Sequence, residues 1–217
     1  MVGRVYSVAF QGVEVLEIDV QVQTSAGLPA FHIVGLGDKA VVESRERIRA
    51  SFHTLGLALP SKHITVNLAP ADVQKEGSHY DLPVALGLMV IMGVLSPEDI
   101  ANYTALGELG LDGTLASVSG ILPAAIDTAA SGRGLICPAI CGSEAAWAGD
   151  LEILAAPNLL ALVNHFKGTQ VLTPPQPKIP DLPLRPALDL YDIKGQEMAK
   201  RALEITAAGG HNLLMMG

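Results

Sequence analysis

Residues 65–95 read TVNLAPADVQKEGSHYDLPVALGLMVIMGVL, and the rest of this 217-residue chain is organised around them. The stretch opens with alternating apolar residues, continues through a polar loop and ends in a nearly uncharged run. Asp81 can accept the free amide hydrogens of a first helical turn, and Pro83 lies early enough to lose no helical hydrogen bond. We therefore predict a strand, a polar loop and a buried helix that begins at Asp81 and ends at Leu95.

The polar loop resembles the active-site loop of Lon-type proteases, in which a strand, a K-x-G loop and a helix of small apolar residues follow one another. The string NLAPADVQKEGSHYDLP is also similar to the signature of the ComM/YifB family, which are bacterial Mg-chelatase-like AAA+ ATPases. The resemblance implies an N-terminal Lon-protease-like domain of the ChlI type, followed by an AAA+ module. It also implies an α/β sandwich with a mixed sheet.

The catalytic residues of a Lon protease are missing from the matching positions. Aligning the helix starts places the nucleophilic serine at Asp81, and aligning the K-x-G loop places it at His79, beside Ser78. The catalytic lysine falls on Leu122, and residues 76–166 contain no lysine. Because a serine without a neighbouring base is a weak nucleophile, we predict the protease fold without a catalytic site. The degenerate protease-site loop comprises Lys75, Ser78, His79 and Asp81, with Lys75 and Glu76 expected as solvated charges or an interface pair.

Composition indicates a folded chain with one well-buried domain and an extra piece. Hydrophobic residues make up 49% and charged residues 17% of the sequence. No uncharged apolar run reaches the roughly 18 residues that a membrane span requires, and no secretory signal is evident at the start. We expect a cytoplasmic protein without a membrane partner. Cys137 and Cys141 lack the two further ligands of a tetrahedral metal site, so we expect free, buried or partly buried thiols and no metal.

The formal charge of −8 is unevenly distributed. Residues 1–75 contain seven Lys or Arg and seven Asp or Glu, whereas residues 76–166 contain one Arg and ten acids. The acidic half would repel phosphate groups, so a whole face that grips DNA is not expected. The candidate contacts with nucleic acid or with another subunit are Arg45, Arg47, Arg49 and Lys62.

Residues 38–55 are predicted to form a helix, which carries Arg45, Arg47 and Arg49. A second interpretation of this helix is a solvated surface helix or a contact with another subunit. Glu43 and Arg47 are four residues apart and can form an ion pair. An inward-facing apolar stripe would then consist of Ile48, Phe52 and Leu55. Both interpretations remain open at the level of sequence.

The other elements follow from alternation, turn residues and apolar periodicity. We expect an antiparallel pair within residues 5–23 around Gln11-Gly12, and strands at 31–34, 105–111, 114–118, 135–138 and 152–155. The hairpin turn lies at Asp112-Gly113. Further helices are expected at 121–130 and 158–166. The sequence GLGD reads as a tight turn leading to a helix capped by Asp38, because it lacks the remaining residues of a phosphate-binding motif.

A proline-rich segment marks a domain boundary. Residues 173–186, TPPQPKIPDLPLRP, hold six of the fourteen prolines. Proline favours extended geometry, so the segment is a semi-rigid spacer or a strap laid over a neighbour. We predict a first domain at 1–170, a linker at 171–187 and a second piece at 188–217.

The final segment, ALDLYDIKGQEMAKRALEITAAGGHNLLMMG, resembles the entrance to an AAA+ module, in which D-x-x-G-Q lies beside the adenine. A helix is expected at 198–208, ended by Gly209-Gly210, and a strand at 212–216. The resemblance implies an incomplete nucleotide site at Asp192, Ile193, Gly195, Gln196 and Gly217, the last being the first glycine of the phosphate loop. ATP and Mg²⁺ are expected only in a longer parent protein, and the chain itself is expected to bind no cofactor.

For that parent, the resemblance implies a homo-oligomeric, hexameric ring that acts on branched DNA in recombination during natural transformation. This chain would be its non-catalytic assembly or regulatory domain. One alternative is a Mg-chelatase-type motor that inserts a metal. The other is a Lon-like peptidase in which Ser78 is the nucleophile and His79, Lys75 or Asp81 is the base.

Overall fold

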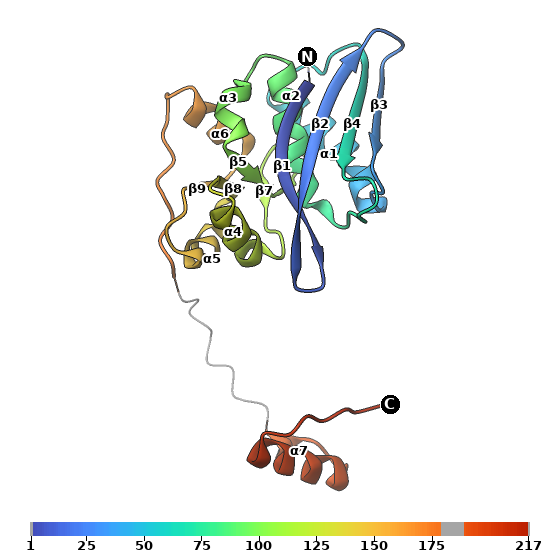
Figure 1. Cartoon of the computed structure of the whole chain (residues 1–217), viewed down its shortest axis with the longest axis vertical. Coiled ribbons are helices and arrows are strands. Elements are labelled where there is room, and N and C mark those ends of the chain that lie inside the picture. Colours follow the sequence, from blue (N-terminus) through green and yellow to red (C-terminus); the bar gives the residue numbers. More distant parts are fainter. Residues whose placement is uncertain (1, 179–188, 217) are drawn as a thin grey trace. The chain divides into compact units, whose positions relative to one another are not determined.

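The computed structural model describes residues 2–178 and 189–216, and the chain divides into two compact units, Met1–Lys178 and Ile179–Gly217. Within residues 2–178 one sheet has seven strands, in the order β3-β4-β2-β1-β5-β8-β9 (Figure 1). Its strands are β1 (Val2–Gln11), β2 (Glu14–Ser25), β3 (Ala30–Val34), β4 (His63–Ala69), β5 (Tyr103–Ala105), β8 (Gly134–Pro138) and β9 (Ile153–Ala156).

The sheet is mixed, and its two halves are built differently. In the first half, β1 pairs with β2 and β2 with β4 in antiparallel register, while β3 lies parallel to β4 at the edge. In the second half, β5, β8 and β9 follow β1 in parallel register, with helices between them. The predicted α/β class with a mixed sheet is confirmed.

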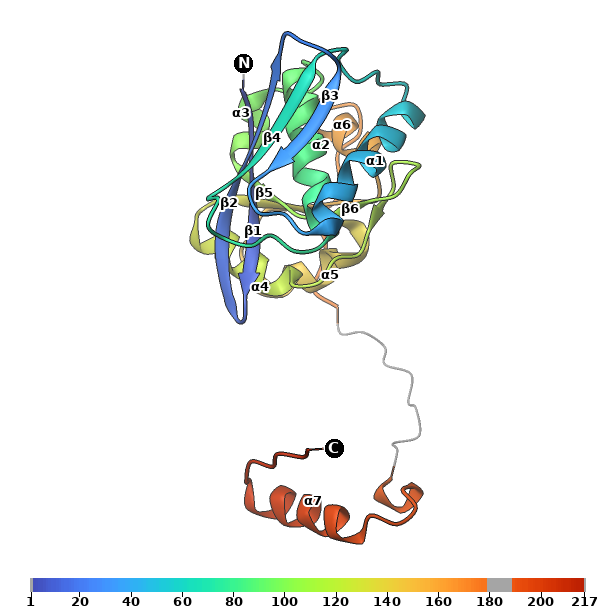
Figure 2. The same cartoon turned by 90° about the vertical axis from the view of Figure 1, so that its right-hand side faces the viewer.

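Helices cover both faces of the parallel half of the sheet. In the first unit they are α1 (Lys39–Thr54), α2 (Asp81–Ile91), α3 (Pro97–Ala101), α4 (Ile121–Ala130), α5 (Gly142–Ala145) and α6 (Leu159–Phe166). Short 3₁₀ turns lie at Ser78–Tyr80, Ala139–Cys141 and Ala146–Ala148. In Figure 1, α1 and α2 lie behind the strands of the antiparallel half, and Figure 2 shows α1 to the right of these strands.

Two hydrophobic clusters lie on opposite faces of the parallel half. Ile136 belongs to the larger cluster with α1, α2 and α6, whereas Leu135 and Cys137 belong to the smaller one with α4 and α5. Successive residues of a strand point to opposite faces, which explains this division. α2 is the centre of the larger cluster, because every residue from Asp81 to Val90 is buried.

α2 ends earlier than predicted. It stops at Ile91 rather than Leu95, because Gly93 adopts a φ of 71° and reverses the chain. A left-handed glycine is a common helix terminator. The residues that follow still pack against the larger cluster through Val94 and Leu95.

The hairpin predicted around Asp112-Gly113 is present, with shorter strands. β6 (Glu108–Leu109) pairs with β7 (Leu115–Ala116) in antiparallel register. The Asp112 carboxylate accepts hydrogen bonds from the amide and the hydroxyl of Thr114, at 3.0 and 2.6 Å. The first residue of the predicted strand, Ala105, belongs instead to β5 of the main sheet.

The start of the proline-rich segment lies against the first unit. Leu172 packs on the larger cluster, and its amide donates to Nδ1 of His165 at 3.0 Å. Pro175 lies close enough to Gly142 that a Cβ atom there would be 3.0 Å from the proline ring. The rest of the predicted linker lies largely outside the described residues.

The second unit contains a 3₁₀ turn at Leu190–Asp192 and the helix α7 (Glu197–Gly209). The predicted helix and its stop at Gly209-Gly210 are confirmed. The prediction of a strand at residues 212–216 is wrong, because the structure places no strand there. A strand needs a hydrogen-bonded neighbour, and no other described residues of this unit are extended beside it.

Candidate functional site

The loop before α2 borders a pocket of about 570 Å³. It lies where the 3₁₀ turn Ser78–Tyr80 meets the β6–β7 hairpin and the end of β1. Most of its lining is polar, and three of the lining side chains are acidic. The lining residues are Phe10, Asp38, Glu76, Gly77, Ser78, His79, Glu108, Ser117, Val118 and Ser119.

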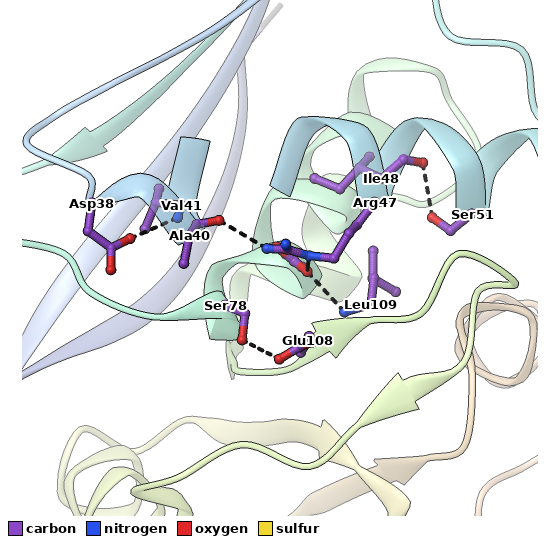
Figure 3. Close-up of polar contacts among 10 residues, drawn as sticks. Asp38, Ala40, Val41, Arg47, Ile48, Ser51, Ser78, Glu108 and Leu109 are labelled. Atoms are coloured by element: carbon purple, nitrogen blue, oxygen red, sulfur yellow. Dashed lines mark hydrogen bonds and ion pairs between the residues drawn. The ribbon is translucent and has the colours of Figure 1, made fainter. Parts of the chain in front are cut away.

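Ser78 is the hydroxyl at the position where the resemblance expects a nucleophile. Its Oγ donates a hydrogen bond to Oε2 of Glu108, as Figure 3 shows. Among residues 2–178, no side-chain hydrogen bond joins the Ser78 hydroxyl to His79, Lys75 or Asp81. A carboxylate is a much weaker base than a lysine or histidine at neutral pH, so this contact does not make Ser78 a strong nucleophile.

His79 is buried and ties the loop to β1. Its Nε2 lies 2.9 Å from the Val8 carbonyl oxygen, and because a carbonyl only accepts, Nε2 carries the proton. The imidazole lies 4.1 Å from the ring of Tyr80 and 5.8 Å from that of Phe10, measured between centroids. Burial lowers the pKa of His79, so the ring is held neutral as a structural group.

Lys75 is fully buried, which corrects the expectation of a solvated charge, whereas Glu76 is exposed. The Lys75 amide donates to the Leu36 carbonyl at 3.0 Å, and the Lys75 carbonyl accepts from the Asp38 amide at 2.9 Å. Its Nζ donates to the Pro70 carbonyl, and burial lowers the pKa of Lys75. These contacts fasten the GLGD turn to the loop, so Lys75 is a structural residue.

Asp38 completes this connection. One carboxylate oxygen accepts from the Val41 amide at 2.9 Å and so caps α1, as predicted. The other accepts from the Gly77 amide at 3.1 Å. A single side chain therefore sets both the start of α1 and the position of the loop before Ser78.

Asp81 forms an ion pair with Arg47 rather than the predicted helix cap. Arg47 Nε lies 2.5 Å from Oδ2 of Asp81 and its Nη2 lies 2.9 Å from Oδ1, in a bidentate arrangement. Arg47 also donates to the Ala40 carbonyl at 3.0 Å, and the Leu109 amide donates to Asp81 at 3.1 Å. The N-cap position of α2 is occupied by Tyr80, which makes no side-chain cap.

This ion pair excludes Arg47 from the proposed nucleic-acid contacts and from the predicted pair with Glu43, which lies near Lys39 instead. The Asp81 side chain is 0% exposed and that of Arg47 is 20% exposed. Burial raises the pKa of Asp81, and the bonds from Arg47 and Leu109 oppose that effect. The same contact raises the pKa of Arg47. The pair therefore fastens α1, α2 and the β6–β7 hairpin together.

The other basic candidates have different surroundings. Arg45 pairs with Glu46 at 2.9 Å on the exposed face of α1. Arg49 and Lys62 meet at a second pocket of about 310 Å³, together with His53. Sequence reasoning missed His53, although it follows Arg49 by four residues and therefore shares its side of the helix.

The remaining candidates are a thiol pair and the turn before α7. Cys137 and Cys141 are buried free thiols, as predicted, and burial raises the pKa of Cys137 to about 12. Asp192 accepts from the Asp189 amide at 3.0 Å, which closes a capping box. Ile193, Gly195 and Gln196 follow it in the turn that leads into α7, whereas Gly217 lies outside the described residues.

Two negative findings apply to the residues that the structure describes. In residues 2–178 and 189–216, no group of three His, Cys, Asp or Glu side chains is arranged to hold a metal ion. In the same residues, no helix has both the length and the apolar character needed to cross a membrane.

Comparison with known proteins identifies relatives of both units. Residues 20–140 match a family model described as "Subunit ChlI of Mg-chelatase", and residues 189–217 match one described as "Magnesium chelatase, subunit ChlI". The chain is 40% identical over 214 residues to the protein YifB of Escherichia coli, which covers 98% of this chain and 42% of that protein.

Two further relatives are similar over the same extent. The competence protein ComM of Haemophilus influenzae is 38% identical over 217 residues, and a Mycobacterium tuberculosis protein is 33% identical over 216 residues. The matches cover 98% and 99% of this chain, and 43% of each relative. The chain thus spans less than half the length of these relatives. It belongs to the Mg-chelatase subunit ChlI family, as a member of the ComM/YifB group.

Proposed function

We propose that this chain is the non-catalytic N-terminal part of a ComM-like AAA+ ATPase, and that it serves assembly or regulation of a motor acting on branched DNA. The observation that carries the first part is the loop before α2. The Ser78 hydroxyl donates to the Glu108 carboxylate, and burial lowers the pKa of His79. Lys75 and Asp81 are bound to other parts of the fold. Each candidate catalytic side chain has a structural partner.

The sequence of the second unit supports the proposal that the longer protein is an ATP-driven motor. Its family match begins at residue 189 and covers α7 and the turn that carries the D-x-x-G-Q residues. ATP and Mg²⁺ are the ligands that this module would take once a complete phosphate loop is present. A homo-oligomeric, hexameric ring is the assembly in which the first unit would act. The relative ComM is named a competence protein, which supports the proposal that the motor acts on DNA.

The ATPase rate of the full-length protein tests this proposal. We expect stimulation by DNA, strongest for a four-way junction, and a stimulation that falls as salt rises because phosphate contacts weaken. Removing residues 1–178 from the full-length protein should change ring formation or junction preference, measured by sedimentation and by the same ATPase assay. Ser78→Ala serves as the matched control and should leave both unchanged.

A rate that ignores every DNA would overturn the DNA assignment. A metal-inserting motor is the second candidate, because both family models are described by the Mg-chelatase subunit. Stimulation of the ATPase by a porphyrin with Mg²⁺, and by no DNA, would favour it.

A further inference from the structure

The second pocket, between α1, the start of β3 and the loop at residues 57–62, has no role in the site described above. Its volume is about 310 Å³. Basic side chains line this pocket, and apolar side chains form much of its wall. The basic residues are Arg49, His53 and Lys62, and the apolar residues include Phe31, Leu57 and Leu59.

The charge of this pocket is opposite in sign to the net charge of the chain. No Asp or Glu is among the residues that line it within the described part of the chain. The larger pocket beside Ser78 is lined by Asp38, Glu76 and Glu108. In a chain of net charge −8, the second pocket is therefore a place where an anion meets attraction rather than repulsion.

The basic groups are available to a ligand. Arg49 and His53 are exposed and four residues apart on α1, and Lys62 is exposed on the adjoining loop. The carboxylate of Glu46 approaches Arg49 only to 3.9 Å, and both side chains are more than half exposed. Exposed pairs at that separation contribute little, so the guanidinium can turn to another anion.

We propose that this pocket binds one unpaired nucleotide of a single-stranded nucleic acid. Arg49 and Lys62 contact the phosphates, and the base rests on His53 and the apolar wall. Single-strand binding sites combine cations that follow the backbone with aromatic or guanidinium planes on which bases stack. The volume lies at the small end of ligand pockets, which run from about 300 to 1,000 Å³. This pocket therefore suits one nucleotide rather than a duplex.

The inference rests on the proposed function, since a motor on branched DNA encounters unpaired strands. It adds the position and the chemistry of a contact. It also corrects the set expected from sequence, because Arg47 and Arg45 are engaged elsewhere and His53 joins Arg49 and Lys62.

Binding of a fluorescent oligothymidylate to the 217-residue chain, followed by anisotropy from about 50 to 200 mM salt, tests the site. Arg49→Gln with Lys62→Gln should weaken binding about tenfold and reduce the salt slope by about 1.4, since each lost phosphate contact to a single strand removes about 0.7. Lys39→Gln with Arg45→Gln is the matched control. It removes the same amount of charge, from two positions on α1 outside the pocket, and should bind like the parent chain.

A third variant separates stacking from charge. His53→Leu should weaken oligothymidylate binding several-fold, because base–aromatic stacking contributes about 1–3 kcal/mol per base, which is about fivefold or more in affinity. Circular dichroism of each variant checks that these exposed substitutions leave the fold intact.

Several outcomes would overturn the inference. One is that the pocket and control variants lose oligothymidylate binding equally. Another is that the parent chain binds no oligothymidylate at low salt. The third is that a polyglutamate peptide competes for the pocket as well as an oligonucleotide does. DNA stimulation of the full-length ATPase alongside any of these would leave the proposed function standing. A DNA-indifferent ATPase alongside binding that depends on Arg49 and Lys62 would retain the pocket and overturn the motor assignment.

Discussion

At the scale of single residues, the polar side chains of the loop before α2 hold the structure together. Asp38 caps α1 and binds the Gly77 amide, His79 binds the Val8 carbonyl, and Asp81 binds Arg47. A buried polar group without a partner is costly, and each of these has one. The loop therefore retains polar residues for reasons that require no catalysis.

Substitutions of Arg47 and Asp81 should have strongly non-additive effects on the free energy of unfolding. Arg47→Met leaves a fully buried carboxylate without its cation, and we expect a loss of about 3–5 kcal/mol in the free energy of unfolding. Asp81→Asn should cost less, because the Arg47 side chain reaches solvent. The double variant should recover most of the loss from Arg47→Met. Urea unfolding followed by the single tryptophan, Trp147, measures all three.

Additive losses in the double variant would contradict this pairing. Arg45→Met is the control, because Arg45 lies two residues away on α1 and pairs with the exposed Glu46. Exposed pairs of that kind contribute between about 0 and 1 kcal/mol.

His79 should make stability depend on pH in the acidic range. Burial lowers the folded-state pKa of His79 below the ordinary value of 6.5. The unfolded state therefore binds a proton that the folded state resists, and stability present above about pH 6.5 is lost as the pH falls. Relative to His79→Gln, the parent chain should lose stability as the pH falls below about 6.5. A difference in stability between the two chains that stays constant as the pH falls below about 6.5 would refute the assignment.

At the scale of elements, α2 determines how the first unit packs. It lies directly on β1 and β2, and glycine makes the close approach possible. A Cβ atom at Gly87 would lie 2.6 Å from Cγ2 of Val22, and one at Gly3 would lie 2.5 Å from the Gly87 carbonyl oxygen. The apolar character of α2 therefore comes with a strict limit on side-chain size at this crossing.

Gly87→Ala tests that limit. Alanine is favoured over glycine in a helix by about 1 kcal/mol, whereas overpacking of a core costs about 1–3 kcal/mol. We expect net destabilisation in urea unfolding, because the contact with Val22 is shorter than side chains tolerate. Adding Val22→Ala should remove the overlap, so the double variant should lose less than the two single losses combined. A stabilised Gly87→Ala chain would show that the helix and sheet can separate freely.

At the scale of the whole molecule, charge separates two kinds of surface on the first unit. The pocket beside Ser78 is acidic, and the pocket beside Arg49 is basic, although α1 contributes to both regions: its cap Asp38 lines the former and Arg49 lines the latter. A single helix therefore links the degenerate protease-site loop to the proposed nucleotide contact. Amide hydrogen exchange of the loop beside Ser78 could be measured with and without an oligonucleotide in the pocket beside Arg49.

The sequence by itself determined the order and class of the elements. Alternation predicted β4, apolar composition predicted α2, Asp38 predicted the start of α1, and Asp112-Gly113 predicted the β6–β7 hairpin. These signals are local, because a turn, a cap or a periodicity acts within a few residues of the chain. The family resemblance rested on similarly contiguous residues.

Only the tertiary structure decided what the charged residues do. Arg47 and Asp81 are 34 residues apart in sequence, so the nearer Glu43 was the expected partner of Arg47. Lys75 is buried by segments that no local pattern places beside it, and residues 212–216 form no strand because pairing requires a neighbour. Ion pairs, burial and strand pairing depend on which distant segments meet, and that is settled only when the chain is packed.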